Sequence, residues 1–380
     1  MTKSLFIFIC LLQQVTGKTQ IIQERIPTDN RMRTGIDTIV QNAVIAFIND
    51  TSRVGLSVGV YKDGKIYTYN YGSLEKGKQK LPSNKSIYEI GSITKTFTGT
   101  LLAQAVLDKK VKIDDDIRKY IDGSYPNLEY QGQPIRLFHL INHMSGLPFF
   151  LPNKPEIFQN ANYDSLPFTI CHIQKQYSRL NFFEDLHKVK LDTVPGFNFH
   201  YSNAGAQLLG YILERLYKMP YDKLLEKYIS APLSMKSTSP FYSKNELGNL
   251  AKGYNNKGNI MPYNPIQLEA AGGIYSTVAD MLKYVRFHLN ENNKIVALSH
   301  KITWGNIKDF GIGLNWQEKK VSDGNRKIWQ SGGTFGFSSY CVIYPELNTG
   351  IVILTNEADQ TAQGGLEEAA NKIFESINKH

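Results

Sequence analysis

Residues 55–72 read GLSVGVYKDGKIYTYNYG, two strand-forming runs on either side of a turn. Hydrophobic and β-branched residues fill 55–62 and 65–72, as expected for strands that are partly buried. The Asp63-Gly64 pair between them is typical of a tight hairpin, because both residue types accept the positive φ angles of such a turn. The sequence therefore predicts an antiparallel hairpin near the start of the chain.

Further strand patterns lie near the other end of the chain, at 326–330, 337–344 and 349–355. Apolar residues at helical spacing predict one helix at 35–50, before the hairpin, and another at 365–378, after the last strand. The middle of the chain favours helices instead, with candidates at 95–107, 136–143, 203–217, 221–228 and 276–289.

We therefore expect an α/β (α+β) fold, in which strands from both chain ends form one antiparallel sheet flanked by terminal helices. A mainly helical domain is inserted between them, and a cleft should form where it meets the sheet, since ligand sites favour such junctions. The expected divisions are a signal peptide at 1–17, an N-terminal leader at 18–34, the first part of the α/β domain at 35–91, the helical insert at 92–300 and the second part of the α/β domain at 301–380.

The N-terminus has the pattern of a secretory signal. A short positive start at Met1–Lys3 precedes an apolar run at 5–12, and small residues suited to cleavage follow at 15–17. The apolar run is far shorter than the ~20 residues that span a bilayer. We expect an exported protein, periplasmic or secreted and soluble after cleavage; an uncleaved anchor is the alternative.

Composition excludes several classes of protein. Of the 380 residues 42% are hydrophobic and 20% are charged, which is typical of a globular chain and not of a disordered one. The net charge is +9, but lysines alternate with acidic residues and form no long basic run, so we predict no nucleic-acid partner. Three cysteines exclude a disulfide scaffold, and pairing of Cys171 with Cys341 is left open. We expect a monomer.

Ser92 and Lys95 are the first candidates for chemistry. They open a predicted helix three residues apart, so their side chains share one face. A serine hydroxyl needs a base to become a nucleophile, and a lysine whose pKa falls on burial can supply one. The spacing alone is weak, because Ser73 and Ser376 also precede a lysine by three residues.

Two later segments carry further candidates. Tyr201 and Asn203 lie two apart in an extended stretch before a predicted helix, where both can face one side. A tyrosine close to a lysine can pass a proton, and an asparagine can bind an amide. The second segment is Gln330-Ser331-Gly332-Gly333, beside a predicted strand, whose backbone N–H groups can complete an oxyanion hole.

Together these segments resemble the serine β-lactamase and penicillin-recognising enzymes, in the class C β-lactamase and DD-peptidase branch. The similar segments cover most of 50–357. They are IGSITKTFTG at 90–99, LFHLINHMSGLP at 137–148, Pro195-Gly196 through Tyr201-Ser202-Asn203 to APLSM at 231–235, AGGIYSTVADM at 271–281, and 332–355.

The resemblance implies a β-lactamase/transpeptidase-like fold and assigns the roles. Ser92 would be the nucleophile, Lys95 and Tyr201 the proton-handling pair, and Asn203 a ligand of the substrate amide. The N–H groups of Ser92 and Gly333 would form the oxyanion hole. Neither a metal nor a cofactor is implied.

Two departures from the branch concern the substrate. Gln330 stands where the branch usually has Lys or His, so Coulomb attraction for a substrate carboxylate is lost. Phe149 and Phe150 follow the Gly-Leu-Pro step and predict an aromatic wall, which suits a DD-peptidase or an esterase better than a fast β-lactamase. The predicted substrate-binding residues are Asn203, Gln330, Ser331, Gly332, Gly333 and Phe150.

The sequence thus predicts an exported serine hydrolase that works through an acyl-enzyme. β-Lactamase or D-Ala-D-Ala carboxypeptidase activity on a small peptide or β-lactam-like substrate leads, with cell-wall peptides among the candidates. An esterase or D-amino-acid peptidase is the first alternative. A penicillin-binding protein with little turnover is the second.

Other polar residues carry weaker interpretations. His139 and His143 are expected four apart on a helix, a spacing that fits a metal ion. The glutamate that metalloproteases have between the two histidines is absent from this segment. Glu269 and Asp280 are read as either cleft-rim or capping residues. The absence of a Gly-x-Ser-x-Gly motif argues against an α/β-hydrolase.

Overall fold

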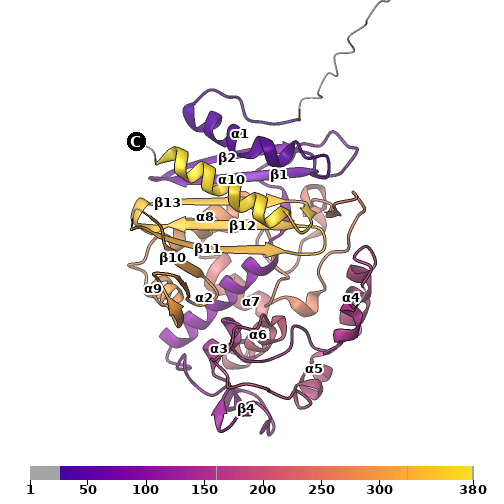
Figure 1. Cartoon of the computed structure of the whole chain (residues 1–380), viewed down its shortest axis with the longest axis vertical. Coiled ribbons are helices and arrows are strands. Elements are labelled where there is room, and N and C mark those ends of the chain that lie inside the picture. The colour runs from indigo at the N-terminus through magenta and orange to yellow at the C-terminus, as the bar shows by residue number, and fades with distance from the viewer. Residues whose placement is uncertain (1–25, 160, 323, 379–380) are drawn as a thin grey trace, which may run out of the picture.

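A computed structural model describes residues 26–159, 161–322 and 324–378. The predicted signal peptide at 1–17 and the first part of the leader lie outside these residues. The described chain is built on one eight-stranded antiparallel sheet (Figure 1). Its strands, in spatial order, are β2 (Lys65–Gly72), β1 (Gly55–Lys62), β13 (Thr349–Thr355), β12 (Ser338–Tyr344), β11 (Arg326–Gly333), β10 (Gln317–Lys320), β9 (Phe310–Ile312) and β8 (Trp304–Asn306).

The sheet confirms that both chain ends contribute strands to it. The predicted hairpin forms, and β1 and β2 have the predicted bounds. In the turn between them, Asp63 and Gly64 have φ angles of 48° and 83°. β1 then pairs with β13 from the far end of the chain, with Val58 opposite Ile353. The α/β fold expected from the sequence is therefore the fold of this protein.

Helices cover both faces of the sheet. On one face α1 (Gly35–Ile48) and α10 (Ala362–Ile377) pack side by side, and α10 crosses the strands in Figure 1. Their buried apolar residues join one face of β1, β12 and β13 in a single core cluster. On the other face α8 (Val278–His288) packs against β1 and β13, although the sequence placed it in the helical insert. The division of the chain at 92 and 300 stays a prediction.

The rest of the middle of the chain is mainly helical, as expected. The predicted 136–143 helix is too long, because the chain leaves the helix after Ile141 and His143 takes a φ of 61°. The remaining elements are helices α2 (Thr94–Leu107), α3 (Leu137–Ile141), α4 (Leu166–Lys175), α5 (Arg179–Leu186), α6 (Asn203–Tyr217), α7 (Tyr221–Leu225) and α9 (Lys294–His300), and the short strand pairs β3 (Ile87–Glu89) with β7 (Tyr275–Thr277), β4 (Glu129–Tyr130) with β5 (Gln133–Pro134) and β6 (Tyr254–Asn255) with β14 (Glu357–Ala358).

The described end of the leader lies along β2, at the edge of the sheet. The N–H of Gly72 donates to the carbonyl oxygen of Pro27 at 2.8 Å, and Thr28 bridges to Tyr71. An open strand edge invites pairing with other chains, and this segment covers part of it. Cys171 and Cys341 are both buried and form no disulfide. None of the helices in the described ranges has the length and apolar character needed to cross a membrane.

Candidate active site

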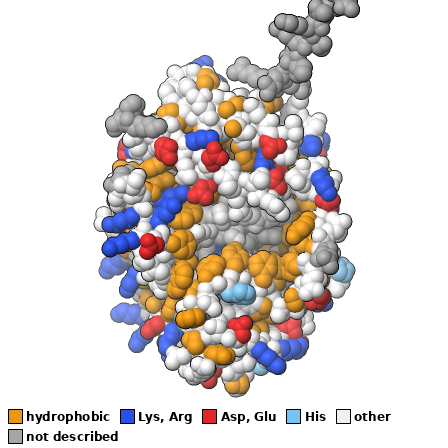
Figure 2. All heavy atoms as spheres, viewed as in Figure 1, with side chains coloured by type: hydrophobic (Ala, Val, Ile, Leu, Met, Phe, Trp, Pro, Cys, Tyr) orange, Lys and Arg blue, Asp and Glu red, His pale blue; other side chains and the backbone are white. Residues whose placement is uncertain are grey.

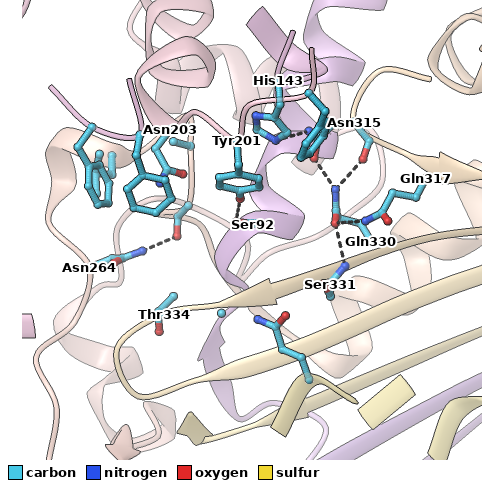
Figure 3. A pocket seen from close by; sticks show the side chains of 18 of the residues that line it. Ser92, His143, Tyr201, Asn203, Asn264, Asn315, Gln317, Gln330, Ser331 and Thr334 are labelled. Atoms are coloured by element: carbon cyan, nitrogen blue, oxygen red, sulfur yellow. Dashed lines mark hydrogen bonds between the residues drawn. The ribbon is translucent and has the colours of Figure 1, made fainter. Parts of the chain in front are cut away.

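The side chains of Ser92 and Tyr201 meet in a cleft between the end of β11 and the helical region (Figure 3), and Lys95 lies behind them in contact with both. Ser92 belongs to a short 3₁₀ turn, Gly91–Ile93, that runs directly into α2. Lys95 Nζ lies 3.0 Å from Ser92 Oγ and 2.8 Å from Tyr201 Oη. The hydroxyls of Ser92 and Tyr201 are hydrogen-bonded to each other. An alcohol, an amine and a phenol therefore lie within proton-transfer distance of one another.

Glycines bring the Ser92 turn against the end of β11. A Cβ atom at Gly332 would lie 2.1 Å from the carbonyl oxygen of Ile90 and 3.0 Å from the backbone nitrogen of Ser92. A Cβ atom at Gly91, whose φ is 52°, would lie 2.6 Å from the nitrogen of Gly333. Any larger residue at either position would push the two segments apart. The backbone N–H groups of Ser92 and Gly333 are thereby held close together beside the hydroxyl.

Lys95 is completely buried at the centre of a polar cluster. Besides the two hydroxyls, its Nζ lies 2.8 Å from Asn203 Oδ1 and 2.6 Å from the carbonyl oxygen of Ala271. Burial lowers the pKa of Lys95, while contact with Tyr201 partly opposes that shift. Lys95 therefore loses its proton at a lower pH than an exposed lysine does, and the neutral amine that results can accept a proton.

Aromatic stacking positions the phenol of Tyr201. Its ring stacks on His143, with the ring centres 4.0 Å apart. His143 Nδ1 accepts a hydrogen bond from the N–H of Ser202, and its Nε2 lies 3.1 Å from Asn315 Nδ2. Burial, and then the charge of Lys95, hold the pKa of His143 well below its ordinary value. His143 is thus a neutral ring that supports Tyr201.

The metal interpretation of His139 and His143 loses its geometric basis. The two residues do not share a helix, because α3 ends at Ile141. His139 Nδ1 accepts from the N–H of Arg136, so its ring caps the start of α3. Within the described part of the chain, no group of three or more His, Cys, Asp or Glu side chains is arranged to hold a metal ion.

Gln330 lies in the cleft wall, but its amide is occupied by protein contacts (Figure 3). Its Nε2 donates to the backbone oxygen of Asn315 at 2.7 Å and to Asn315 Oδ1 at 2.5 Å. Its Oε1 accepts from Gln317 Nε2 and from the N–H of Ser331, both at 3.0 Å. Both donors and the acceptor of this amide are therefore already used.

The cleft encloses about 640 Å³, and eight of the described residues that line it are Phe, Tyr or Trp. Figure 2 shows the face on which it opens, with hydrophobic side chains gathered along one edge of the hollow. Of the predicted site residues, Ser92, Tyr201, Asn203, Gln330, Ser331, Gly333 and Phe150 all line it, Lys95 lies directly behind it, and Gly332 makes the close backbone approach.

Other predicted residues lie away from the cleft, and some lining residues were missed. Glu269 and Asp280 do not line it. The Asp280 carboxylate accepts from the N–H of Ser237 and pairs with Lys283. The pattern around Tyr201 held a usable signal for one missed residue, because Phe199 precedes it by two positions in an extended segment. The lining residues that sequence reasoning missed include Phe199, Trp304, Phe310, Asn315 and Gln363, and His143, which was considered only as a metal ligand, also lines the cleft.

A buried carboxyl group lies behind the cleft wall. Glu89 is 1% exposed, and its Oε1 accepts from the N–H of Asn264, a cleft residue, at 2.6 Å. The side chains of Thr334 and Tyr275 lie next to this carboxyl group and lower its pKa, against the larger effect of burial. Burial raises the pKa of Glu89 to about 7, against an ordinary value of 4.5. The carboxyl group is therefore more protonated in the folded chain than in the unfolded one at mildly acid pH.

Glu89→Gln is expected to make stability less dependent on pH. Because the folded pKa is raised, the contribution of Glu89 is full below about pH 4.5 and is lost as the pH rises through about 7, a difference of about 3 kcal/mol. A glutamine keeps the acceptor for Asn264 without the charge. As the pH rises from about 5 to about 8, the free energy of unfolding of the variant should therefore increase relative to that of the wild type.

Urea unfolding across that pH range checks this expectation. Glu375→Gln, the same substitution at an exposed position on α10, is the matched control. A difference between Glu89→Gln and wild type that does not change with pH would contradict the assignment of a raised pKa.

Fold and site together define a protein of the β-lactamase/transpeptidase type. The family model described as Beta-lactamase matches residues 37–372, and the chain belongs to the beta-lactamase family. Among solved structures, the beta-lactamase/D-alanine carboxypeptidase from Pseudomonas syringae superposes with a TM-score of 0.75 at 22% identity, over 90% of this chain and 99% of that one. This likeness establishes the shared fold.

Curated relatives of the chain carry different names. D-alanyl-D-alanine-carboxypeptidase/endopeptidase AmpH from Escherichia coli (strain K12) is 25% identical over 341 residues, which cover 85% of each chain. Protein flp from Staphylococcus aureus (strain MRSA252) is 25% identical over 346 residues, covering 87% of this chain and 64% of flp. The chain thus spans somewhat less than two thirds of the length of flp.

Proposed function

We propose that this protein is a serine hydrolase that forms an acyl-enzyme at Ser92. The observation that carries the proposal is the meeting of Ser92 Oγ with Lys95 Nζ and Tyr201 Oη at the cleft. A hydroxyl in contact with a buried amine of lowered pKa has a base at hand, which is what a serine nucleophile requires. Membership of the beta-lactamase family supports the same reaction type.

Each proposed step uses groups already in place. Ser92 Oγ attacks the substrate carbonyl carbon and its proton passes to the Lys95–Tyr201 pair. The N–H groups of Ser92 and Gly333 stabilise the negative oxygen of the tetrahedral intermediate. The pair then returns the proton to the leaving group, the bond to that group breaks, and water later releases the acyl group. Asn203 Oδ1 accepts from Lys95, so its Nδ2 is the atom available to bind a substrate amide.

Two substrate classes fit this reaction. β-Lactams and D-alanyl peptides are favoured by the names of relatives such as AmpH. Esters, or D-amino-acid peptides, are favoured by the aromatic cleft and by the occupied amide of Gln330. A penicillin-binding protein with little turnover remains the non-enzymatic alternative. We also propose export, periplasmic or secreted, on the basis of the N-terminal sequence pattern alone.

Mass spectrometry of the intact protein tests the acyl-enzyme directly. After incubation with a fluorescent penicillin or a p-nitrophenyl ester, the protein should gain the mass of one acyl group on the peptide that contains Ser92. Persistent penicillin labelling without hydrolysis would favour the binding protein, and rapid β-lactam hydrolysis the lactamase. Hydrolysis of esters alone would favour the esterase. An adduct on another residue, or neither an adduct nor turnover with any probe, would refute the proposal.

A further inference from the structure

We infer that the cleft selects substrates that are uncharged next to the scissile bond and that carry an aryl group there, such as neutral aryl esters. The inference rests on the proposed function, because it concerns what the same Ser92 site binds. Of the two substrate classes given above, it favours the esters.

The cleft offers no fixed charge to an anionic substrate. None of the described residues that line it is Asp, Glu, Lys or Arg. The nearest cation is Lys95, which is fully buried and has four oxygen atoms of the protein within hydrogen-bond distance. His143 lines the cleft as a neutral ring. A carboxylate that entered would lose water without gaining a charged partner, which is costly.

The amide of Gln330, a polar side chain in the cleft wall, is also unavailable to a carboxylate. Gln330 is 7% exposed, and its amide is hydrogen-bonded to Asn315, Gln317 and Ser331. Asn315 in turn donates to the carbonyl oxygen of Ile141, which anchors this network to the helical region. A substrate carboxylate could take a hydrogen bond from Gln330 only by breaking a contact that holds the wall together.

Two groups of aromatic rings line the cleft that holds the Ser92 hydroxyl. In the first, Phe149 contacts Phe150 and Tyr201, with ring centres 4.5 Å and 5.9 Å apart. In the second, Trp304 contacts Phe199 and Phe310, with ring centres 6.5 Å apart in each pair.

Several of these rings also offer free surface. Phe149 and Phe199 are 42% and 48% exposed although both line the cleft. Exposed aromatic faces around a nucleophile favour a flat hydrophobic group by burial and ring stacking.

A matched substrate pair tests the inference. Meta-acetoxybenzoate and its methyl ester share the same acetyl group and an aryl leaving group, and differ in one carboxylate. We expect kcat/KM for the methyl ester to exceed that for the acid by about tenfold or more, because the unpaired carboxylate is desolvated. Each rate is taken as the part lost in Ser92→Ala, so that only turnover at this site is counted.

The outcomes separate the inference from the proposed function. Ser92-dependent turnover that is equal for both esters, or faster for the acid, would overturn the inference and leave the serine hydrolase standing. No Ser92-dependent turnover of either ester, or of any penicillin, would overturn the proposed function and the inference with it.

A charge placed in the wall gives a second readout. In Gln317→Lys the ammonium can still donate to Gln330 Oε1, as the Gln317 amide does, while adding a cation to the cleft. We expect the preference for the neutral ester to shrink at least about fivefold, through a lower KM for the acid. Gln317→Met, of similar length without charge, is the control: it loses the hydrogen bond to Gln330 and adds no cation, so a change in preference seen only in Gln317→Lys is due to the charge. An unchanged preference in Gln317→Lys would contradict a role for missing charge. Gln330→Lys would not separate the effect of charge from that of packing, because it also breaks the contacts with Asn315.

Discussion

Ser92→Ala is expected to lower kcat for the best substrate by a factor of about 10⁴ or more, because removal of a serine nucleophile leaves only binding and the oxyanion hole. The covalent adduct should disappear at the same time. The substitution removes one oxygen that contacts Lys95 and Tyr201, and it leaves the glycine contacts around the turn unchanged. The loss should therefore appear in turnover and not in folding. Stopped-flow or steady-state hydrolysis, with circular dichroism as the check on folding, provides the measurement.

Ser376→Ala is the matched control for this experiment. Ser376 also precedes a lysine by three residues in the sequence, but it lies near the C-terminal end of α10 and does not line the cleft. The control should keep wild-type activity. Activity retained in Ser92→Ala would mean that another group attacks the substrate, and the proposed mechanism would fail.

Lys95→Met is expected to slow formation of the acyl-enzyme by about 10³-fold, within the range that general-base groups contribute. Methionine fills a similar volume in the buried site but cannot accept the proton of Ser92. In the wild type, the acylation rate should rise with pH through an apparent pKa below that of an ordinary lysine, because burial lowers the pKa of Lys95. Single-turnover rates measured against pH would test both expectations.

Lys95→Arg distinguishes a base from a charge. The guanidinium group stays protonated at any pH the protein survives, so it can supply positive charge but cannot take a proton. If Lys95 is the base, both variants should be impaired to a similar degree. Wild-type acylation by Lys95→Arg, with a loss only in Lys95→Met, would show that this position acts through charge alone. Tyr201 would then be the remaining candidate for the base.

Local signals made much of the fold predictable. The hairpin at 55–72 was fixed by one Asp-Gly turn between two apolar strands, and α6 was bounded correctly by its own apolar periodicity. The outer strands β8–β10 were missed because each has only three or four residues. In addition, β10 is polar throughout and consists of Gln317-Glu318-Lys319-Lys320. Charged residues are common on strands at or near a sheet edge and hide the usual strand pattern.

Part of the site could likewise be predicted from local sequence, and part depends on contacts between residues far apart in the chain. Ser92 and Lys95 could be paired from their spacing on one helix. Tyr201 was a candidate from its own segment, and the family resemblance joined it to them. The contacts of Gln330 with Asn315 could not be foreseen, because they join side chains that meet only after the sheet has formed. The placement of α8 on the sheet likewise depends on tertiary packing, which no pattern within residues 276–289 specifies.

The order of strands in the sheet has a consequence for synthesis on the ribosome. β1 is made early, yet its inner neighbour β13 is among the last segments to be translated, and the nitrogen of Gly333 is also made late. A nascent chain that already contains Ser92 therefore lacks both the completed sheet and half of the proposed oxyanion hole. Hydrolytic activity should begin only after translation has passed β13, so that the unfinished polypeptide cannot attack the ester or amide bonds of its surroundings.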